Sequence, residues 1–320
     1  MTVPAPAQQH QQQRAVQADA TATAVRAVWN SVDADHLEAS WLARVPTVAE
    51  MIRRGQLSAA STAETWLDAE VGAGEGRLNP EAAVAATGDL GLQLLYPLLV
   101  AWNRISRGMS IAVSILSGAA FLELATRSLV ADAGRIADMA GMIARPRVVS
   151  YVRVVELPAC SRCVLLAGRE YSFSEGFLRH PNCDCTMAPK RPGDGWTPQL
   201  PEDVYAQMTP AERRRAFGEA GVQAIDAGAD IAQVVNARRG MTTVTRYRRT
   251  VQATSEGTTR RGLYASRRAK FEKAAGVRFG AATGARARTT TPRLMPEEIF
   301  RLADDRDHAI RLLRKYGYIV

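Results

Sequence analysis

The sequence predicts a mainly helical protein with a small β-hairpin, which belongs to the α+β class. Apolar residues recur at helical spacing through most of the first half, and a short run of β-branched residues follows. The chain of 320 residues is 47% hydrophobic but only 6% aromatic, which favours helices packed through small and aliphatic side chains. This length allows two or three modest domains with real cores.

The N-terminal region is expected to be a short arm followed by helices. Residues 1–20 are rich in Ala, Pro and Gln, so we expect a disordered arm in which His10 is solvated. Residues 21–147 are expected to be helical, and Asn79 before Pro80 is typical of a helix start.

The most apolar stretch, 91–125, is interrupted by Arg104 and Arg107. The uncharged runs on either side are shorter than the roughly 18–20 residues that span a bilayer. We therefore expect a buried core helix and no membrane partner. No segment typical of a secretory signal is visible, so reduced thiols are expected.

Residues 148–190 combine a strand with a cluster of metal-binding residue types. The β-branched and aromatic run at 148–157 predicts a strand. All four cysteines and one histidine then follow within 26 residues: Cys160, Cys163, His180, Cys183 and Cys185. Tetrahedral zinc takes four thiolate or imidazole ligands, commonly as two close pairs at the ends of a loop.

A structural Zn²⁺ is therefore predicted, bound by Cys160, Cys163, His180 and Cys185, with Cys183 as the alternative fourth ligand. The residues from 164 to 173 are expected to form a short hairpin that returns the chain to the metal. Two disulfides, unligated cysteines and a catalytic zinc are the alternatives. The predicted fold is thus mainly α with a small β-hairpin zinc knuckle: a helical N-terminal region, a zinc-bound core and a basic flexible C-terminal region.

The last third of the chain is predicted to contain a helical region, a basic segment and a terminal helix. Residues 201–237 are expected to be helical, and Thr209 with Glu212 forms a capping box. Residues 238–293 are an Arg-rich flexible segment with 15 Lys or Arg and two acids, whereas the rest of the chain has a net charge of −4. Residues 294–320 are expected to contain a C-terminal helix with one apolar face.

A segment with this charge is a candidate for non-specific contacts with the phosphates of double-stranded DNA. The alternative is a solvated linker. The residues predicted to bind nucleic acid are Arg238, Arg239, Arg246, Arg248, Arg249, Arg260, Arg261, Arg267, Arg268 and Lys270.

The cysteine segment resembles the phage Mu F-like (MuF) minor head protein family. The resemblance rests on Cys160 and Cys163, on Gly168 five residues later, and on the His-Pro-Asn-Cys-Asp-Cys run that ends at Cys185; it covers about residues 90–190. It implies a minor capsid or head morphogenesis protein of a tailed phage, located in the virion or procapsid interior and in the host cytoplasm during assembly. Portal, capsid or scaffold proteins and packaged DNA are the implied partners.

No catalytic residue is predicted, and the chain is expected not to be an enzyme. A capsid maturation protease is the alternative function, followed by a zinc-supported nuclease. The sequence shows no arrangement of serine, histidine and acid typical of a protease. A nuclease of that kind needs a second histidine beside the metal, and His36 and His308 are remote in sequence and expected at the surface.

Overall fold

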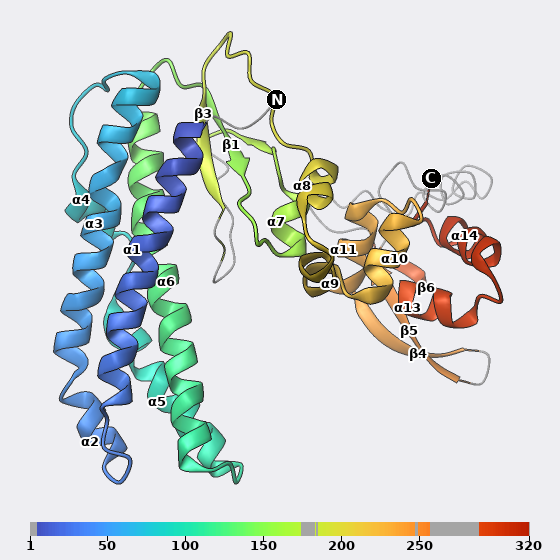
Figure 1. The fold of residues 1–320 in the computed structure, drawn as a ribbon, viewed down its shortest axis with the longest axis horizontal. Helices are drawn as coiled ribbons and strands as arrows, with labels where there is room; N and C mark the ends of the chain where they lie inside the picture. Colours follow the sequence, from blue (N-terminus) through green and yellow to red (C-terminus); the bar gives the residue numbers. More distant parts are fainter. Residues whose placement is uncertain (1–4, 174–182, 184, 247–248, 257–287, 320) are drawn as a thin grey trace. The chain divides into compact units, whose positions relative to one another are not determined.

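The computed structural model describes residues 5–173, 183, 185–246, 249–256 and 288–319 (Figure 1). For 244–246, 249 and 288–292 it describes the backbone alone. The described part of the chain is mainly helical with two small antiparallel sheets. It divides into two compact units: Met1–Glu156 with Ala167–Gln199, and Leu157–Leu166 with Leu200–Val320.

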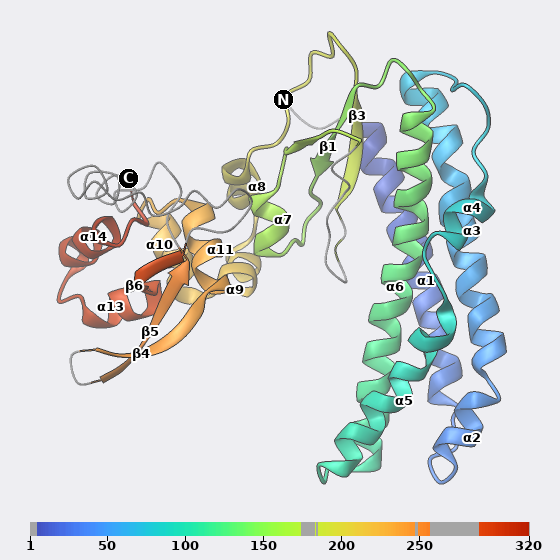
Figure 2. The same ribbon diagram turned by 180° about the vertical axis from the view of Figure 1, so that it is seen from behind.

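The first unit is a helical bundle with a small sheet. Helices α1, α3, α5 and α6 run side by side (Figures 1 and 2), and α6 packs against the other three. The elements of this unit are α1 (Ala5–Asn30), α2 (Leu37–Leu42), α3 (Val45–Val71), α4 (Pro80–Ala85), α5 (Leu90–Ser106), α6 (Ile111–Ile143), β1 (Ser150–Val154), β2 (Glu170–Tyr171) and β3 (Thr186–Lys190).

The apolar stretch at 91–125 is divided between two helices, α5 and α6, rather than forming one core helix. By length and composition alone, α6 is long and apolar enough to cross a membrane. It also buries a face of small residues, including Gly118, Ala119 and Ala133, against its neighbours. A Cβ atom at Gly118 would lie 2.7 Å from the carbonyl oxygen of Pro97, so glycine permits the close approach of α5 and α6.

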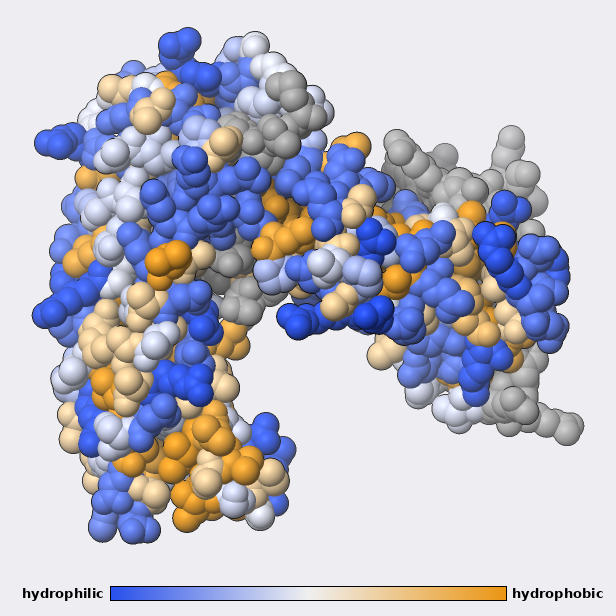
Figure 3. Space-filling view, viewed as in Figure 1, coloured by the Kyte–Doolittle hydropathy of each residue, from blue (hydrophilic) through white to orange (hydrophobic). Residues whose placement is uncertain are grey.

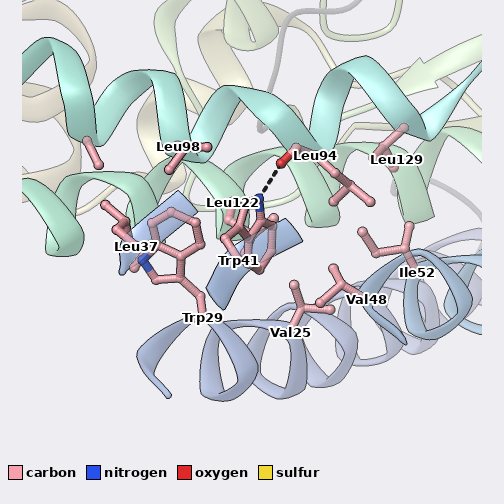
Figure 4. Packing of buried hydrophobic residues seen from close by; sticks show 12 residues of the cluster. Val25, Trp29, Leu37, Trp41, Val48, Ile52, Leu94, Leu98, Leu122 and Leu129 are labelled. Atoms are coloured by element: carbon pink, nitrogen blue, oxygen red, sulfur yellow. Dashed lines mark hydrogen bonds between the residues drawn. The ribbon is translucent and has the colours of Figure 1, made fainter. Parts of the chain in front are cut away.

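The core of the bundle is built around two tryptophans (Figure 4). The rings of Trp29 and Trp41 meet edge to face, with their centroids 4.7 Å apart. Trp41 Nε1 donates a hydrogen bond to the carbonyl oxygen of Leu94 over 2.7 Å, and Trp29 Nε1 donates to that of Ile115 over 2.9 Å. Each indole therefore fills the core and also satisfies its buried N–H group.

The predicted disordered arm at 1–20 is wrong for residues 5–20, which form the first part of α1. His10 is 3% exposed rather than solvated, and it stacks on Trp66 with ring centroids 4.3 Å apart. Its Nε2 lies 2.8 Å from a carboxylate oxygen of Asp138, which also pairs with Arg14. These contacts hold the start of α1 against the rest of the bundle. The sequence does not reveal them, because the partner Asp138 lies more than 120 residues away.

The sheet of the first unit has the order β2-β1-β3, and both strand pairs are antiparallel. Strand β1 lies within the predicted run at 148–157. The predicted hairpin over 164–173 differs from the structure, because Val164 and Leu165 belong to the short helix α7 (Ser161–Leu165). The turn prediction at Gly168 agrees with its φ of +67°.

The second unit combines short helices with a three-stranded antiparallel sheet of order β4-β5-β6. Its core contains Val234, Val251, Leu294, Leu313 and Tyr318. Besides α7, its elements are α8 (Pro201–Gln207), α9 (Pro210–Phe217), α10 (Glu219–Asp226), α11 (Ile231–Arg239), β4 (Met241–Arg246), β5 (Arg249–Glu256), β6 (Arg288–Leu294), α13 (Pro296–Leu302) and α14 (Arg306–Lys315).

Both ends of the segment predicted to be flexible, 238–293, are ordered in the sheet. Arg293 is an example: the residue is 1% exposed, and its guanidinium donates to the carbonyl oxygens of Glu256 and Tyr316 and lies over the ring of Tyr318. Arg293, which the sequence places in a flexible and solvated segment, is therefore part of the core. Residues 257–287, in the middle of this segment, lie outside the described part of the chain.

The C-terminal region contains two helices, α13 and α14, where one C-terminal helix was predicted.

Candidate metal centre

Three of the four cysteines lie close together. Cys163 is in α7, and Cys183 and Cys185 precede β3. The Sγ atoms of these three residues all lie within 4.8 Å of one another, and all three residues are buried. Cys160, the residue that caps α7, has its Sγ 3.6 Å from that of Cys163. The cysteines can therefore hold a metal ion.

Zinc bound by thiolates has Zn–S bonds of about 2.3 Å, which separate two sulfurs on the same ion by about 3.8 Å. Three sulfurs within 4.8 Å of one another are therefore close enough to be candidate ligands of one ion. The alternative of two disulfides finds no support, because none of the four cysteines is joined in a disulfide.

Two buried arginines of the first unit interact with Cys183 and Cys185, one through hydrogen bonds to their backbone and the other through its charge. Arg135, on α6, donates hydrogen bonds to the carbonyl oxygens of both cysteines, the one to Cys185 over 3.0 Å. Arg153, on β1, donates from Nε to the hydroxyl of Tyr171 over 3.2 Å. The carbonyl contacts fix the backbone and leave both sulfurs available to a ligand.

Arg153 also favours the thiolate form that a metal requires. Burial lowers the pKa of the Arg153 guanidinium, but the thiolate charges of Cys185 and Cys183 and the hydrogen bond with the Tyr171 hydroxyl more than offset this and raise the pKa above its usual value. The same attraction stabilises the deprotonated sulfurs. Metal binding releases the thiol protons, so cations beside the ligands favour it.

Two of the four predicted ligands belong to the group of three cysteines, and the other two do not. Cys163 and Cys185 lie in the group of three, together with Cys183, which the sequence analysis gave as the alternative. Cys160 is adjacent to Cys163 but is not a member of that group. His180 lies outside the described residues, so the choice of the fourth ligand remains a prediction.

Sequence reasoning missed the supporting residues, Arg135 and Arg153. Arg135 lies 50 residues before Cys185 in the chain, and no local pattern connects them. The sequence contains a weak signal for Arg153, because this residue stands between Val152 and Val154 in a run that predicts a strand. In the structure it is 1% exposed. A charge inside a buried strand requires a buried partner.

Few of the predicted nucleic-acid contacts can be placed. Arg238, the penultimate residue of α11, is half-buried and pairs with Glu297 over 3.3 Å, and Arg239, the last residue of the helix, is exposed. Arg246 and Arg249 are described as backbone at the ends of β4 and β5. The other predicted residues lie outside the described part of the chain: Arg248, Arg260, Arg261, Arg267, Arg268 and Lys270.

The remaining histidines lie away from the cysteines in sequence and have acidic neighbours. His36 is exposed, and its Nδ1 lies 3.0 Å from Asp33. His308 is at the start of α14, with its Nδ1 3.0 Å from Asp304. In the part of the chain that the structure describes, the three cysteines form the one group of His, Cys, Asp or Glu side chains close enough to share a metal ion.

Comparison with known proteins adds a family assignment. Searches of curated proteins and of solved structures find no significant match. A family model described as VG15 protein matches residues 1–211, which is more than half of the chain and includes the helical bundle, the small sheet and all four cysteines. The chain therefore belongs to the VG15 protein family, and this membership indicates a phage-encoded protein.

Proposed function

We propose that this protein is a minor capsid or head morphogenesis protein of a tailed phage. The observation that carries the proposal is the VG15 match over residues 1–211, which indicates a phage-encoded protein. The finer role is supported by the order of helices followed by a Cys-x-x-Cys and His-Pro-x-Cys-x-Cys segment, which resembles the phage Mu F-like family. The protein would act in procapsid assembly near the portal, in contact with portal, capsid or scaffold proteins.

The proposed metal is a structural Zn²⁺. Three buried sulfurs within 4.8 Å supply three ligands, and Cys160 or His180 supplies the fourth. When bound, the ion would supply a closed thiolate-rich coordination shell that stabilises the fold and carries no substrate. Metal analysis of purified, reduced protein tests this: about one zinc per chain is expected, and metal-free protein that resists a strong chelator without loss of structure would contradict it.

The head role is tested by removing the gene from cells that express the complete set of head genes. We expect empty or aberrant procapsids, and normal heads when the wild-type gene is supplied in trans. Mass spectrometry of purified wild-type procapsids should find the protein together with the portal. Normal DNA-filled heads in the absence of the gene would refute the proposal.

We also propose that the arginine-rich segment contacts packaged DNA through phosphates. The support is its local excess of 15 basic residues over two acids. With the full chain, DNA affinity should fall steeply as salt rises, with a log–log slope of about −0.9 for each phosphate neutralised. Affinity that does not change between low and high salt would argue for a solvated linker instead.

The protein is proposed to act without enzymatic activity, and the two alternatives have separate tests. A maturation protease would cleave itself or the capsid protein, and one serine or cysteine substitution would abolish the cleavage. A nuclease would degrade plasmid DNA in the presence of magnesium. Intact substrates in both assays would support the structural role.

A further inference from the structure

Helix α5 has two apolar faces, and the bundle covers only one of them. The inner face consists of Leu94, Pro97, Leu98 and Ala101, all buried. The outer face carries five large side chains that are between 37% and 70% exposed. We call these residues the α5 outer stripe: Leu92, Leu95, Tyr96, Leu99 and Trp102.

The spacing of the α5 outer stripe is that of a helix–helix contact. Its members follow one another at intervals of three, one, three and three residues, which keeps them on one side of a helix. Figure 3 shows apolar surface gathered at the end of the first unit where α5 and the beginning of α6 lie. The exposed residues Met109, Ile111 and Leu116 extend it. A helix that is apolar all round is normally covered, so this surface indicates a partner.

The charges at the two ends of the stripe indicate which partner. Asp89 caps the start of α5, and Arg107 follows its end; both are exposed. They are 18 residues apart, which is five turns of an α-helix, so they lie on the same flank of the stripe. Arg104 adds a second positive charge at the same end. From residue 90 to 122 the sequence contains no acid, so an acid that pairs with these arginines would have to come from outside this stretch.

A second copy of the chain meets this requirement when its α5 lies antiparallel. Reversal about residue 97 pairs Leu92 with Trp102 and Leu95 with Leu99, so that four of the five side chains of the stripe face one another. The same reversal brings Asp89 of each copy to the arginine end of the other. A parallel arrangement would instead place like charges together, and it would align the two helix dipoles unfavourably.

We propose that two copies of this protein associate through an antiparallel pairing of their α5 outer stripes. The dimer is isologous, since the same surface contributes from both copies. The pairing removes from water an apolar surface that the bundle leaves exposed. The proposal is independent of the metal centre and of the proposed head role.

Sedimentation of the full chain over a range of concentrations tests the pairing. The wild type should dimerise, and Leu99→Glu should weaken dimerisation at least about 30-fold, as expected for a central contact. Leu92→Glu should act in the same direction. Val16→Glu is the matched control, because Val16 is 69% exposed on α1 and lies outside the stripe. Unchanged thermal melting would establish that each variant is folded.

A double variant tests the orientation. In the antiparallel arrangement residue 95 of one copy faces residue 99 of the other, so a chain that carries both Leu95→Lys and Leu99→Glu should recover dimerisation that Leu99→Glu alone loses. A parallel pair of this double variant would instead place lysine against lysine and glutamate against glutamate. Sedimentation of the full chain compares the two variants.

A wild-type protein that stays monomeric at high concentration would overturn the proposal. So would dimers that Leu99→Glu and Leu92→Glu leave intact, or a double variant Leu95→Lys with Leu99→Glu that dimerises no better than Leu99→Glu alone. Monomers that sediment with vesicles of anionic lipid, and lose this with Leu99→Glu, would also overturn it in favour of a membrane surface.

Discussion

Replacement of Asp138 by asparagine should destabilise the helical bundle strongly. The Asp138 carboxylate is fully buried and is shared by two cationic or polar partners, Arg14 and the His10 imidazole. Arg14 is itself 4% exposed and also donates to the Thr186 hydroxyl over 2.5 Å. Asp138→Asn keeps the size of the side chain but removes the charge that compensates the buried guanidinium. Loss of one partner from a buried ion pair costs about 3–5 kcal/mol.

Urea unfolding followed by tryptophan fluorescence measures this change in the first unit. All five tryptophans, Trp29, Trp41, Trp66, Trp102 and Trp196, belong to that unit, and His10 stacks directly on Trp66. Asp19→Asn is the matched control, because Asp19 pairs with Arg127 at the surface, where an ion pair contributes less than about 1 kcal/mol. The double variant Arg14→Met with Asp138→Asn should recover part of the loss.

The pH dependence of stability gives a second measure of the same contact. Burial alone would raise the pKa of Asp138, but the charge of Arg14 and the hydrogen bond with His10 hold it below its usual value. The ionised carboxylate therefore stabilises the fold above the unfolded-state pKa of about 3.9, and this contribution is lost as pH falls through the lower folded-state pKa. The difference in stability between wild type and Asp138→Asn should shrink only below about pH 4. A loss at pH 7 no larger than that of Asp19→Asn would refute this account.

Three further changes should have measurable effects. Cys163→Ser should reduce bound zinc from about one per chain to near zero, whereas Ser161→Ala, in the same short helix, should leave the metal content unchanged. Gly118→Ala should destabilise the bundle by about 1–3 kcal/mol although alanine is the better helix former, because the new Cβ meets Trp29 and the backbone of Pro97; a stabilised variant in the fluorescence assay would contradict this. Arg293→Met should raise the amide hydrogen-exchange rates of α14, because it removes donors to the carbonyl oxygens of Glu256 and Tyr316; unchanged rates would show that the buried guanidinium is dispensable.

Local signals in the sequence predicted several elements well. Asn79 caps α4 through hydrogen bonds from the backbone N–H groups of Glu81 and Ala82, and the Thr209 capping box starts α9. The strand expected at 148–157 contains β1. In each case the deciding contacts lie within a few residues of one another. The cysteines are also clustered in the sequence, within 26 residues, and three of their sulfurs lie close together in the structure.

The error at the N-terminus has the opposite origin, since it involves contacts between residues far apart in the chain. The first turns of α1 read as a solvated arm because the partners of His10 and Arg14 lie on α6 and β3. The hairpin predicted over 164–173 failed for a different reason: Val164 and Leu165 are β-branched or apolar, yet they complete a helical turn that begins at Ser161. Short apolar runs do not distinguish a strand from one turn of helix.

The arginines show how far charge composition can be used to infer DNA binding. Among the residues that the structure describes, five arginines are buried and stabilise the fold: Arg14, Arg135, Arg145, Arg153 and Arg293. Each donates to carboxylates, carbonyls or hydroxyls inside the protein. Arg293 belongs to the basic segment itself, so the local excess of charge there sets an upper limit on the number of phosphates bound. The slope of log affinity against log salt concentration measures the number of phosphates neutralised. We expect this slope to be much less steep than it would be if all 15 basic residues of the segment bound phosphates.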